Sequence, residues 1–257
     1  ICGRRRYIAP GVSAANGKIY CAPNGTSRAI CIDPEGNTAE MLGPEFDYME
    51  GLGKYNAAGV LAANGKIYFA PCHASRAMCI DPEANAAELF GPHFEFSECS
   101  GNYCAAGVLA PNGKIYFAPY GASRALCIDP SRNSAEMLGP AIEGGPGGRY
   151  AAAGALAPNG KIYFAPHAAS QAMCIDPVLD TVEFLGPKVD GGATKYLAAG
   201  VVAPDGMVYF APCGAGRVLR INAQAGTADF FGPELDGVDK YGPSGVLAPN
   251  GKIYYAP

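Results

Sequence analysis

A tyrosine recurs six times along this chain, each time nine residues before an Asn-Gly or Asp-Gly pair. Successive tyrosines are separated by 45 to 48 residues, and a period of that length is typical of a repeat architecture. This feature constrains the fold strongly, because every copy must form the same unit and pack against its neighbours. The tyrosines are Tyr7, Tyr55, Tyr103, Tyr150, Tyr196 and Tyr241, and their partners are Asn16, Asn64, Asn112, Asn159, Asp205 and Asn250.

Each repeat contains four short apolar runs separated by turn residues. In the third copy, AAGVLA is followed by PNG, KIYFAP, a Gly-Ala-Ser turn, RALCID, an Asp-Pro turn and AEMLG. Asn-Gly between two such runs predicts a hairpin with a type I′ turn. Asp-Pro predicts a second turn, in which the aspartate accepts hydrogen bonds from backbone N–H groups. No run is long enough for a helix, so we expect a four-stranded antiparallel meander, with strands a to d in chain order.

The apolar runs are continuous rather than alternating, which is typical of strands that are covered on both faces. Strand a is built from small residues, which suit the crowded axis of a ring of sheets. We therefore expect an all-β protein, a β-propeller of four-stranded antiparallel blades with strand a innermost. Segments such as LAPNGKIYFAPYGASRALCIDP resemble the blades of NHL-type propellers over nearly the whole chain, and the repeat also resembles those of uncharacterised algal proteins. The resemblance implies a fold and no activity.

Five repeats are complete and the sixth ends after strand b, so six blades are expected, of which the last is partial. If Gly3 ends strand d of the sixth blade, the ring closes and lacks only strand c and most of strand d. A fragment of a longer ring or of a longer protein is the alternative. We expect a single domain over residues 1–257, with blades at approximately 7–43, 55–91, 103–139, 150–186, 196–232 and 241–257.

Composition excludes some classes of protein. A net charge of −4 and only 16% charged residues argue against nucleic-acid binding. No apolar stretch reaches the roughly 18 residues of a transmembrane helix, so a soluble chain is expected. Cys99 and Cys104 form a Cys-x4-Cys pattern that could pair or bind a metal with His93. Four other cysteines share one site on strand c, where they are interpreted as buried apolar residues and favour a reducing compartment: Cys31, Cys79, Cys127 and Cys174.

The connections between strand d and the next strand a carry the length variation. From the glycine that ends strand d to the next tyrosine, the spacing falls from 12 to 9 residues, while the rest of each repeat keeps its length. Variation on one face of a repeat protein indicates where its specificity lies. The first two connections combine apolar and acidic residues, as an interface does, although the rings could instead fold inward and cap the blades. The candidate partner-binding residues are Phe46, Tyr48, Met49, Glu50, Phe94, Glu95, Phe96 and Glu98.

A second candidate site is a ring of tyrosines with the arginines that begin strand c. Guanidinium groups pair with oxyanions and aromatic faces stack on sugars, so this ring would supply one weak ligand site per blade. The alternative is a structural role in blade packing. The candidate ring comprises Tyr55, Arg76, Tyr103, Arg124, Tyr150, His167, Tyr196 and Arg217.

Nothing in the sequence indicates catalysis. The inner strands AAGVLA, AAGALA and AAGVVA carry no metal ligand of the kind that gluconolactonase-like propellers use, and the three histidines share no motif. We therefore expect no enzyme activity, no metal and no cofactor. The favoured function is a non-catalytic scaffold that binds a protein partner, as a subunit of a larger assembly. A lectin-like propeller that binds a glycan or an anion is the alternative, and a metal-dependent lactonase or hydrolase is the third.

Overall fold

The computed structural model describes residues 6–45, 53–94, 101–142, 148–190 and 192–257. These residues form β-strands joined by turns, and no helix occurs among them. The strands assemble into five four-stranded sheets, which we call blades 1 to 5, and one two-stranded sheet, blade 6. Neighbouring strands pair in chain order and antiparallel in every blade, so the predicted meander is confirmed.

The strands have nearly the same lengths in each complete blade. Blade 1 contains β1 (Val12–Ser13), β2 (Ile19–Cys21), β3 (Ala29–Asp33) and β4 (Thr38–Leu42). Blade 2 contains β5 (Val60–Leu61), β6 (Ile67–Phe69), β7 (Ala77–Asp81) and β8 (Ala86–Phe90). Blade 3 contains β9 (Val108–Leu109), β10 (Ile115–Phe117), β11 (Ala125–Asp129) and β12 (Ser134–Leu138). Blade 4 contains β13 (Ala155–Leu156), β14 (Ile162–Phe164), β15 (Ala172–Asp176) and β16 (Thr181–Leu185). Blade 5 contains β17 (Val201–Val202), β18 (Met207–Phe210), β19 (Val218–Asn222) and β20 (Thr227–Phe231), and blade 6 contains β21 (Val246–Leu247) and β22 (Ile253–Tyr254).

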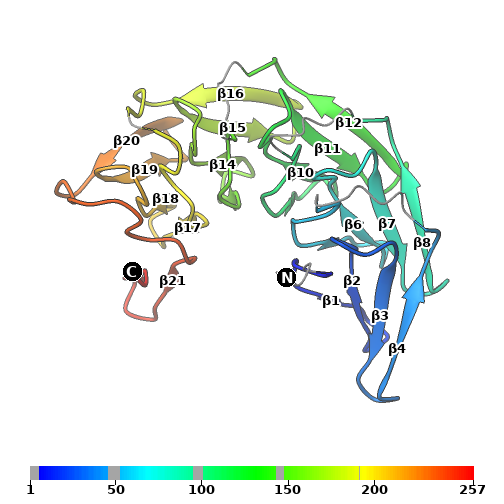
Figure 1. The fold of residues 1–257 in the computed structure, drawn as a ribbon. Coiled ribbons are helices and arrows are strands. Elements are labelled where there is room, and N and C mark those ends of the chain that lie inside the picture. Colours follow the sequence, from blue (N-terminus) through cyan, green and yellow to red (C-terminus); the bar gives the residue numbers. More distant parts are fainter. Residues whose placement is uncertain (1–5, 46–52, 95–100, 143–147, 191) are drawn as a thin grey trace.

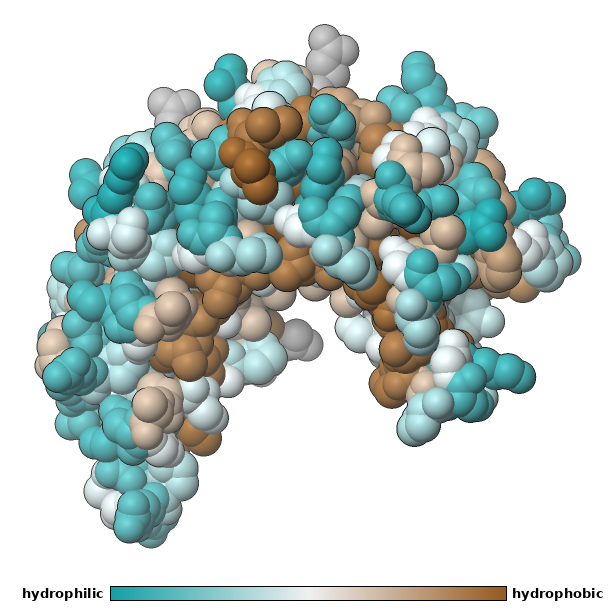
Figure 2. Space-filling view, turned by 180° about the vertical axis from the view of Figure 1, so that it is seen from behind, coloured by the Kyte–Doolittle hydropathy of each residue, from teal (hydrophilic) through white to brown (hydrophobic). Residues whose placement is uncertain are grey.

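The blades follow one another along an arc around a common centre (Figure 1). Strand a of each blade lies toward the centre and strand d toward the rim, and the inner strands of adjacent blades contact one another, as β13 contacts β17. Hydrophobic residues gather along the concave side of the arc (Figure 2). The expectation that the small residues of strand a line the axis is therefore confirmed.

The hydrophobic core lies between the blades. Between blades 2 and 3, Tyr68 and Cys79 of one sheet pack with Phe117, Leu126 and Ile128 of the next. The second and fourth residues of strand c face the preceding blade, and the first and third face the following one. Both faces are buried, which explains the continuous apolar runs, and each large side chain removed from water contributes about 1.5–3 kcal/mol.

The hairpin between strands a and b has a different turn from the predicted one. A type I′ turn needs positive φ at both central residues, but only the glycine of each Asn-Gly pair has it, as Gly113 does at 80°. The Gly113 N–H donates to Ala110 O and the Ala110 N–H donates to Lys114 O, at 2.9 Å each, which is the pattern of a type I turn with a glycine bulge. The prediction of a hairpin is confirmed and that of type I′ is wrong. In this geometry, the side chain of Asn112 reaches the neighbouring blade.

The Asp-Pro turn between strands c and d has the predicted structural role. Oδ1 of Asp81 accepts the backbone N–H groups of Glu83 and Ala84 at 3.0 Å. These bonds, with Lys66 3.0 Å away, hold the pKa of the Asp81 carboxyl below its ordinary value. The lysine of the a–b turn therefore ties the two turns of one blade together.

Candidate functional site

The tyrosines of the predicted ligand ring are fully buried, and each uses its hydroxyl group inside the protein. Tyr55 donates to Arg76 O at 2.9 Å, and Tyr103 donates to Arg124 O at 3.1 Å. Tyr150 and Tyr196 make the same bond to the carbonyl oxygens of Gln171 and Arg217. Because these rings have no exposed surface, the ligand-stacking role predicted for them needs correction, although Tyr150 lines one small cavity beside strand c. They tie the start of strand a to the start of strand c within one blade.

The arginines of that ring remain exposed. Two cavities lie at equivalent places beside the start of strand c, one of about 180 Å³ lined by Gln171 and one of about 300 Å³ lined by Arg217. Lys188, Asp190 and Glu234 also line the second cavity. One small cavity in each of two blades is compatible with a repeated weak site, which stays a prediction for Arg76, Arg124 and Arg217.

Most of the predicted partner-binding residues lie outside the described part of the chain. Phe94 is described, and it is 2% exposed. Its ring packs edge-on against Tyr103 with centroids 5.9 Å apart, and its N–H donates to Ser75 O at 2.7 Å. Phe94 therefore caps a blade and is no exposed anchor. The residues outside the described ranges are Phe46, Tyr48, Met49, Glu50, Glu95, Phe96 and Glu98.

The strongest candidate site lies where each blade joins the next at the inner end of strand a. There, the Asn102 N–H donates to Cys72 O and the Tyr103 N–H donates to Pro71 O, so the end of one strand b meets the start of the next strand a. Two residues are therefore neighbours at each junction. One follows the Ala-Pro that ends strand b, and the other follows the repeat tyrosine of the next blade. We call these ten residues the junction ring: Asn24 with Asn56, Cys72 with Cys104, Tyr120 with Ala151, His167 with Leu197, and Cys213 with Gly242.

A chain of polar contacts connects the first two junctions. Asn24 Nδ2 donates to Asn56 Oδ1 and to Tyr55 O. Asn56 Nδ2 lies 3.1 Å from Cys72 Sγ, which in turn lies 3.2 Å from Cys104 Sγ. Asn24 and Cys72 are buried, whereas Asn56 and Cys104 are only half-buried. This part of the ring therefore places an amide and a thiol within reach of solvent.

The two thiols are chemically different. The hydrogen bond between them, with help from Asn56, lowers the pKa of Cys104 although burial opposes it. The same hydrogen bond and burial raise the pKa of Cys72. His73 Nδ1 lies 3.4 Å from Cys72 Sγ and 3.0 Å from Gly53 O. Cys104 is thus the side chain of the ring that most readily becomes a thiolate, which is the reactive form of cysteine.

The other junctions carry less reactive groups. The Tyr120 and His167 rings lie 5.7 Å apart, and His167 is buried with Nδ1 3.2 Å from Gly148 O. Ala151 and Leu197 are apolar. In the part of the chain that the structure describes, no three His, Cys, Asp or Glu side chains group to hold a metal ion. Cys99 lies outside that part, and Cys104 contacts Cys72, 32 residues away.

Three basic side chains that the sequence analysis did not single out support the ring. Each precedes a repeat tyrosine and donates to the preceding blade's b–c turn. Lys54 Nζ donates to Thr26 O at 3.1 Å, Arg149 Nη1 to Gly121 O at 3.0 Å, and Lys195 Nζ to Ala168 O at 3.3 Å. Lys54 and Lys195 are buried. Two sequence signals could have pointed to this site. A basic residue recurs before the tyrosine, and the residue after the tyrosine differs from repeat to repeat.

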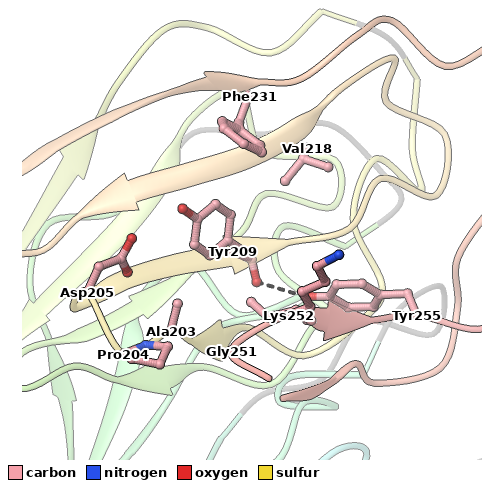
Figure 3. Close-up of a pocket in the computed structure, with 10 residues that line it drawn as sticks. Ala203, Pro204, Asp205, Tyr209, Val218, Phe231, Gly251, Lys252 and Tyr255 are labelled. Carbon is pink, nitrogen blue, oxygen red and sulfur yellow. Dashed lines mark hydrogen bonds between the residues drawn. The ribbon is translucent and has the colours of Figure 1, made fainter. Parts of the chain in front are cut away.

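A larger cavity of about 710 Å³ lies between blades 5 and 6 (Figure 3). Tyr209, Val218 and Phe231 of blade 5 line it, together with Tyr255, whose hydroxyl donates to Tyr209 O at 3.0 Å. In the preceding junction, residues of strands c and d of the following blade, such as Leu219, pack at the equivalent place. The blade 5 wall of this cavity is therefore a surface that packs against the next blade. In blade 6, two strands, β21 and β22, are described.

Repeated four-stranded meanders with a central inner strand and a core between the sheets define the chain as a β-propeller. No family model and no curated protein sequence matches it, so the resemblance to NHL-type repeats is not confirmed. A virginiamycin B lyase from Staphylococcus aureus has a similar structure, with a TM-score of 0.66 and 12% identity over 99% of this chain and 85% of that chain. Hydrazine synthase from Kuenenia stuttgartiensis gives 0.59 and 15% identity over 99% and 76% of the two chains. A putative 6-phosphogluconolactonase from Bacteroides uniformis gives 0.56 and 16% over 96% and 76%.

These comparisons correct one expectation. The sequence analysis expected no enzyme, but the similar solved structures include named enzymes, a lyase and a lactonase-like protein among them. At this level of identity they show a shared fold and transfer no activity. Separately, none of the described residues belongs to a helix long and apolar enough to cross a membrane.

Proposed function

We propose that this propeller binds a small, polar, uncharged molecule at the junction ring, with Asn56 and Cys104 in contact with it. One observation carries the proposal. In a repeat whose strand and turn residues hardly change, the two facing junction positions hold Asn with Asn, Cys with Cys, Tyr with Ala, His with Leu, and Cys with Gly. A position that only served packing would be expected to vary as little as its neighbours in the repeat.

The groups in the ring favour the class of ligand. Asn56 offers both a donor and acceptors, and Cys104 offers a polarizable sulfur, while the ring contains no Lys, Arg, Asp or Glu. An anionic ligand would find no formal positive charge there. Lys54 and Lys195 lie behind the ring, where they donate to backbone carbonyl groups.

The fold comparisons support a small-molecule role. One similar structure is a catalytically inactive virginiamycin B lyase with quinupristin, and another is a putative 6-phosphogluconolactonase. Propellers of this shape thus include proteins named for reactions on small molecules. If this chain also catalyses a reaction, Cys104 is the candidate nucleophile, because its pKa is lowered and it is half-buried.

The proposal is tested by a thermal-shift screen of neutral sugars, amides and cyclic peptides against the reduced protein, followed by calorimetry. Replacing Asn56 or Cys104 by Ala should weaken binding of a hit by about tenfold, which corresponds to about 1.4 kcal/mol for a lost polar contact. Val178→Ser is the control, since Val178 is 87% exposed in a c–d turn. The absence of any hit, or hits that all three variants bind alike, would refute the proposal.

A second candidate function is protein binding through the face that carries the d–a connections. The variation in length of these connections favours it, and Val238, in the connection after blade 5, leaves an apolar side chain 77% exposed on that face. Phe46, Tyr48 and Phe96 are the residues to test. Replacing all three by Ser should remove a stoichiometric partner from the natively isolated protein, whereas Val178→Ser should not. Retention of every partner by the triple variant would refute this role.

A further inference from the structure

Cys72 and Cys104 belong to different blades, yet their sulfur atoms are 3.2 Å apart. The backbone holds them in place, because Asn102 and Tyr103, just before Cys104, donate to Cys72 O at 2.6 Å and to Pro71 O at 3.1 Å. A disulfide has an S–S distance of about 2.05 Å, so the two sulfur atoms need to approach each other by roughly 1 Å. The pair is therefore placed for a covalent link between blade 2 and blade 3.

The surroundings give the two thiols different roles. Cys104 is half-buried and accessible, while Cys72 is fully buried behind it. Cys104 is also the more acidic of the two. His73 Nδ1 lies 3.0 Å from Gly53 O, which can only accept, so this nitrogen carries a proton and faces Cys72 Sγ as a donor, 3.4 Å away. An attacking thiolate in front of a second thiol is the arrangement that thiol–disulfide exchange needs.

The equivalent positions supply a comparison within the molecule. Cys213 occupies the same place as Cys72 and is 1% exposed, and its Sγ lies 3.8 Å from Asp239 Oδ1 instead of a second thiol. The strand-c cysteines face other blades from within the core. Among the described residues, the contact between Cys72 and Cys104 is thus the one that brings two sulfur atoms together.

We propose that Cys72 and Cys104 form a reversible disulfide by exchange with a low-molecular-weight disulfide such as oxidised glutathione. The Cys104 thiolate attacks one sulfur of the reagent, and one thiolate leaves. Cys72, after losing its proton, then attacks the Cys104 sulfur of the mixed disulfide and releases the second thiolate. The two protein thiols are oxidised, the reagent is reduced to two thiols, and the two protons lost by the cysteines end on them.

The link would tie two blades beside the proposed ligand site and cover Cys104. The inference shares Cys104 with the proposed function but does not depend on it, because exchange is measured without any ligand. Binding is measured on the reduced protein, so each idea can fail alone. Closing a loop of this length restricts the unfolded chain, so the oxidised protein should melt roughly 5–10 °C higher than the reduced one.

The experiment uses the full chain. The protein is equilibrated with reduced and oxidised glutathione at several ratios, quenched with acid, alkylated and mapped by mass spectrometry. We expect a Cys72–Cys104 peptide in the oxidising buffers and its loss with dithiothreitol. Cys104→Ser and Cys72→Ser should remove the linked peptide, while the matched variant Cys213→Ser should retain it. The wild-type map needs no variant, so misfolding of a variant cannot hide the result. Both thiols remaining alkylated in the most oxidising buffer, or a link from Cys104 to Cys99 instead, would overturn the proposal.

Discussion

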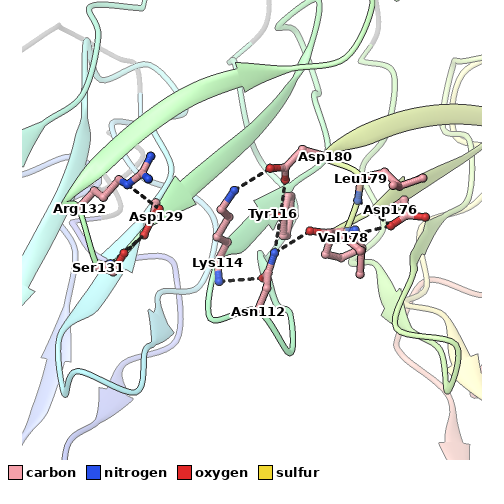
Figure 4. Close-up of polar contacts among 11 residues, drawn as sticks. Asn112, Lys114, Tyr116, Asp129, Ser131, Arg132, Asp176, Val178, Leu179 and Asp180 are labelled. Atoms are coloured by element: carbon pink, nitrogen blue, oxygen red, sulfur yellow. Dashed lines mark hydrogen bonds and ion pairs between the residues drawn. The ribbon is translucent and has the colours of Figure 1, made fainter.

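The side-chain amide of Asn112 lies 2.8 Å from the carbonyl oxygen of Pro177, which belongs to the following blade (Figure 4). The same amide nitrogen also donates to the hydroxyl of Tyr116, and Asn112 Oδ1 accepts the Lys114 N–H. The Asn112 side chain thus stabilises its own hairpin and links that hairpin to the next blade. The equivalent residues Asn16, Asn64 and Asn159 make the same interblade bond, to Pro82, Pro130 and Ala223.

This arrangement predicts that the same Asn→Ala substitution lowers stability by different amounts at two equivalent positions, Asn112 and Asn250. Asn112→Ala should lower the free energy of unfolding by about 1–2 kcal/mol, because it removes a bond between blades and leaves a carbonyl unpaired. Asn250→Ala should cost less, since among the described residues Asn250 bonds within its own hairpin, to Tyr254 and Lys252, and it is exposed. Urea denaturation of both variants checks this, and equal losses would contradict the interblade role.

A second prediction concerns acid stability. Burial alone would raise the pKa of Asp180, but hydrogen bonds from Lys114 at 2.7 Å and Tyr116 at 2.8 Å outweigh it, so the pKa is lowered (Figure 4). The unfolded chain then binds the proton more tightly than the folded one. Asp180 therefore stabilises the fold above the ordinary carboxyl pKa, and this contribution is lost as the pH falls through the lowered value.

Asp180→Asn should accordingly be less stable than wild type at neutral pH and should lose less stability between about pH 5 and pH 3. Asp190→Asn is the control, because it makes the same chemical change at an exposed carboxylate. Thermal melts across the pH range provide the measurement. A wild-type and an Asp180→Asn profile that run parallel would show that this network does not contribute to acid stability.

Much of the fold was predictable because turn chemistry and repeat period depend on local sequence. The Asn-Gly and Asp-Pro pairs located the hairpins, and the small residues of strand a identified the inner strand. The type I′ prediction failed because the loop has three residues, Pro111, Asn112 and Gly113, of which only Gly113 has positive φ. Among the described residues, blade 6 has the same turn at Gly251 without the bond between blades, so the turn itself is local. What no local pattern reveals is the bond from Asn112 to Pro177, 65 residues away.

The site was less predictable than the fold. The recurrence of Tyr103 and its equivalents suggested a ligand ring, but recurrence reflected a buried bond to a backbone carbonyl. Phe94, read as an exposed anchor, is core for a similar reason. The junction ring has the opposite sequence pattern. Its residues differ from repeat to repeat, while the neighbouring positions keep the same residues. Pairing Cys104 with Cys72 required knowing that consecutive blades meet at their inner ends, which sequence spacing alone does not give.

A third prediction separates the cysteines by reactivity. Burial raises the pKa of Cys79, Cys127 and Cys174 to about 11, and each lies between two sheets. Iodoacetamide at neutral pH should therefore modify Cys104 of the native, reduced protein before these three, which should react only when the protein unfolds. Peptide mapping over a time course provides the rates. Comparable rates for Cys104 and Cys127 would contradict the assignment of Cys104 as the thiolate.

The last prediction concerns the cavity between blades 5 and 6. Val218 and Phe231 form an apolar wall there, at places that residues of the following blade's strands c and d cover in the preceding junction. An apolar fluorescent dye should bind this wall, and Phe231→Ser should reduce its fluorescence about twofold or more, because the largest apolar side chain of the wall is lost. Val178→Ser, on an exposed turn, should leave the signal unchanged.

A peptide with the sequence of residues 124–139, strands c and d of blade 3, should displace the dye. It carries Leu126 and Ile128 at the two strand-c positions that face the preceding blade within this fold. The same peptide with both residues changed to Ser keeps the turn and loses the apolar face, so it should not compete. Equal competition by the two peptides would show that the wall binds apolar compounds without recognising a strand of the repeat.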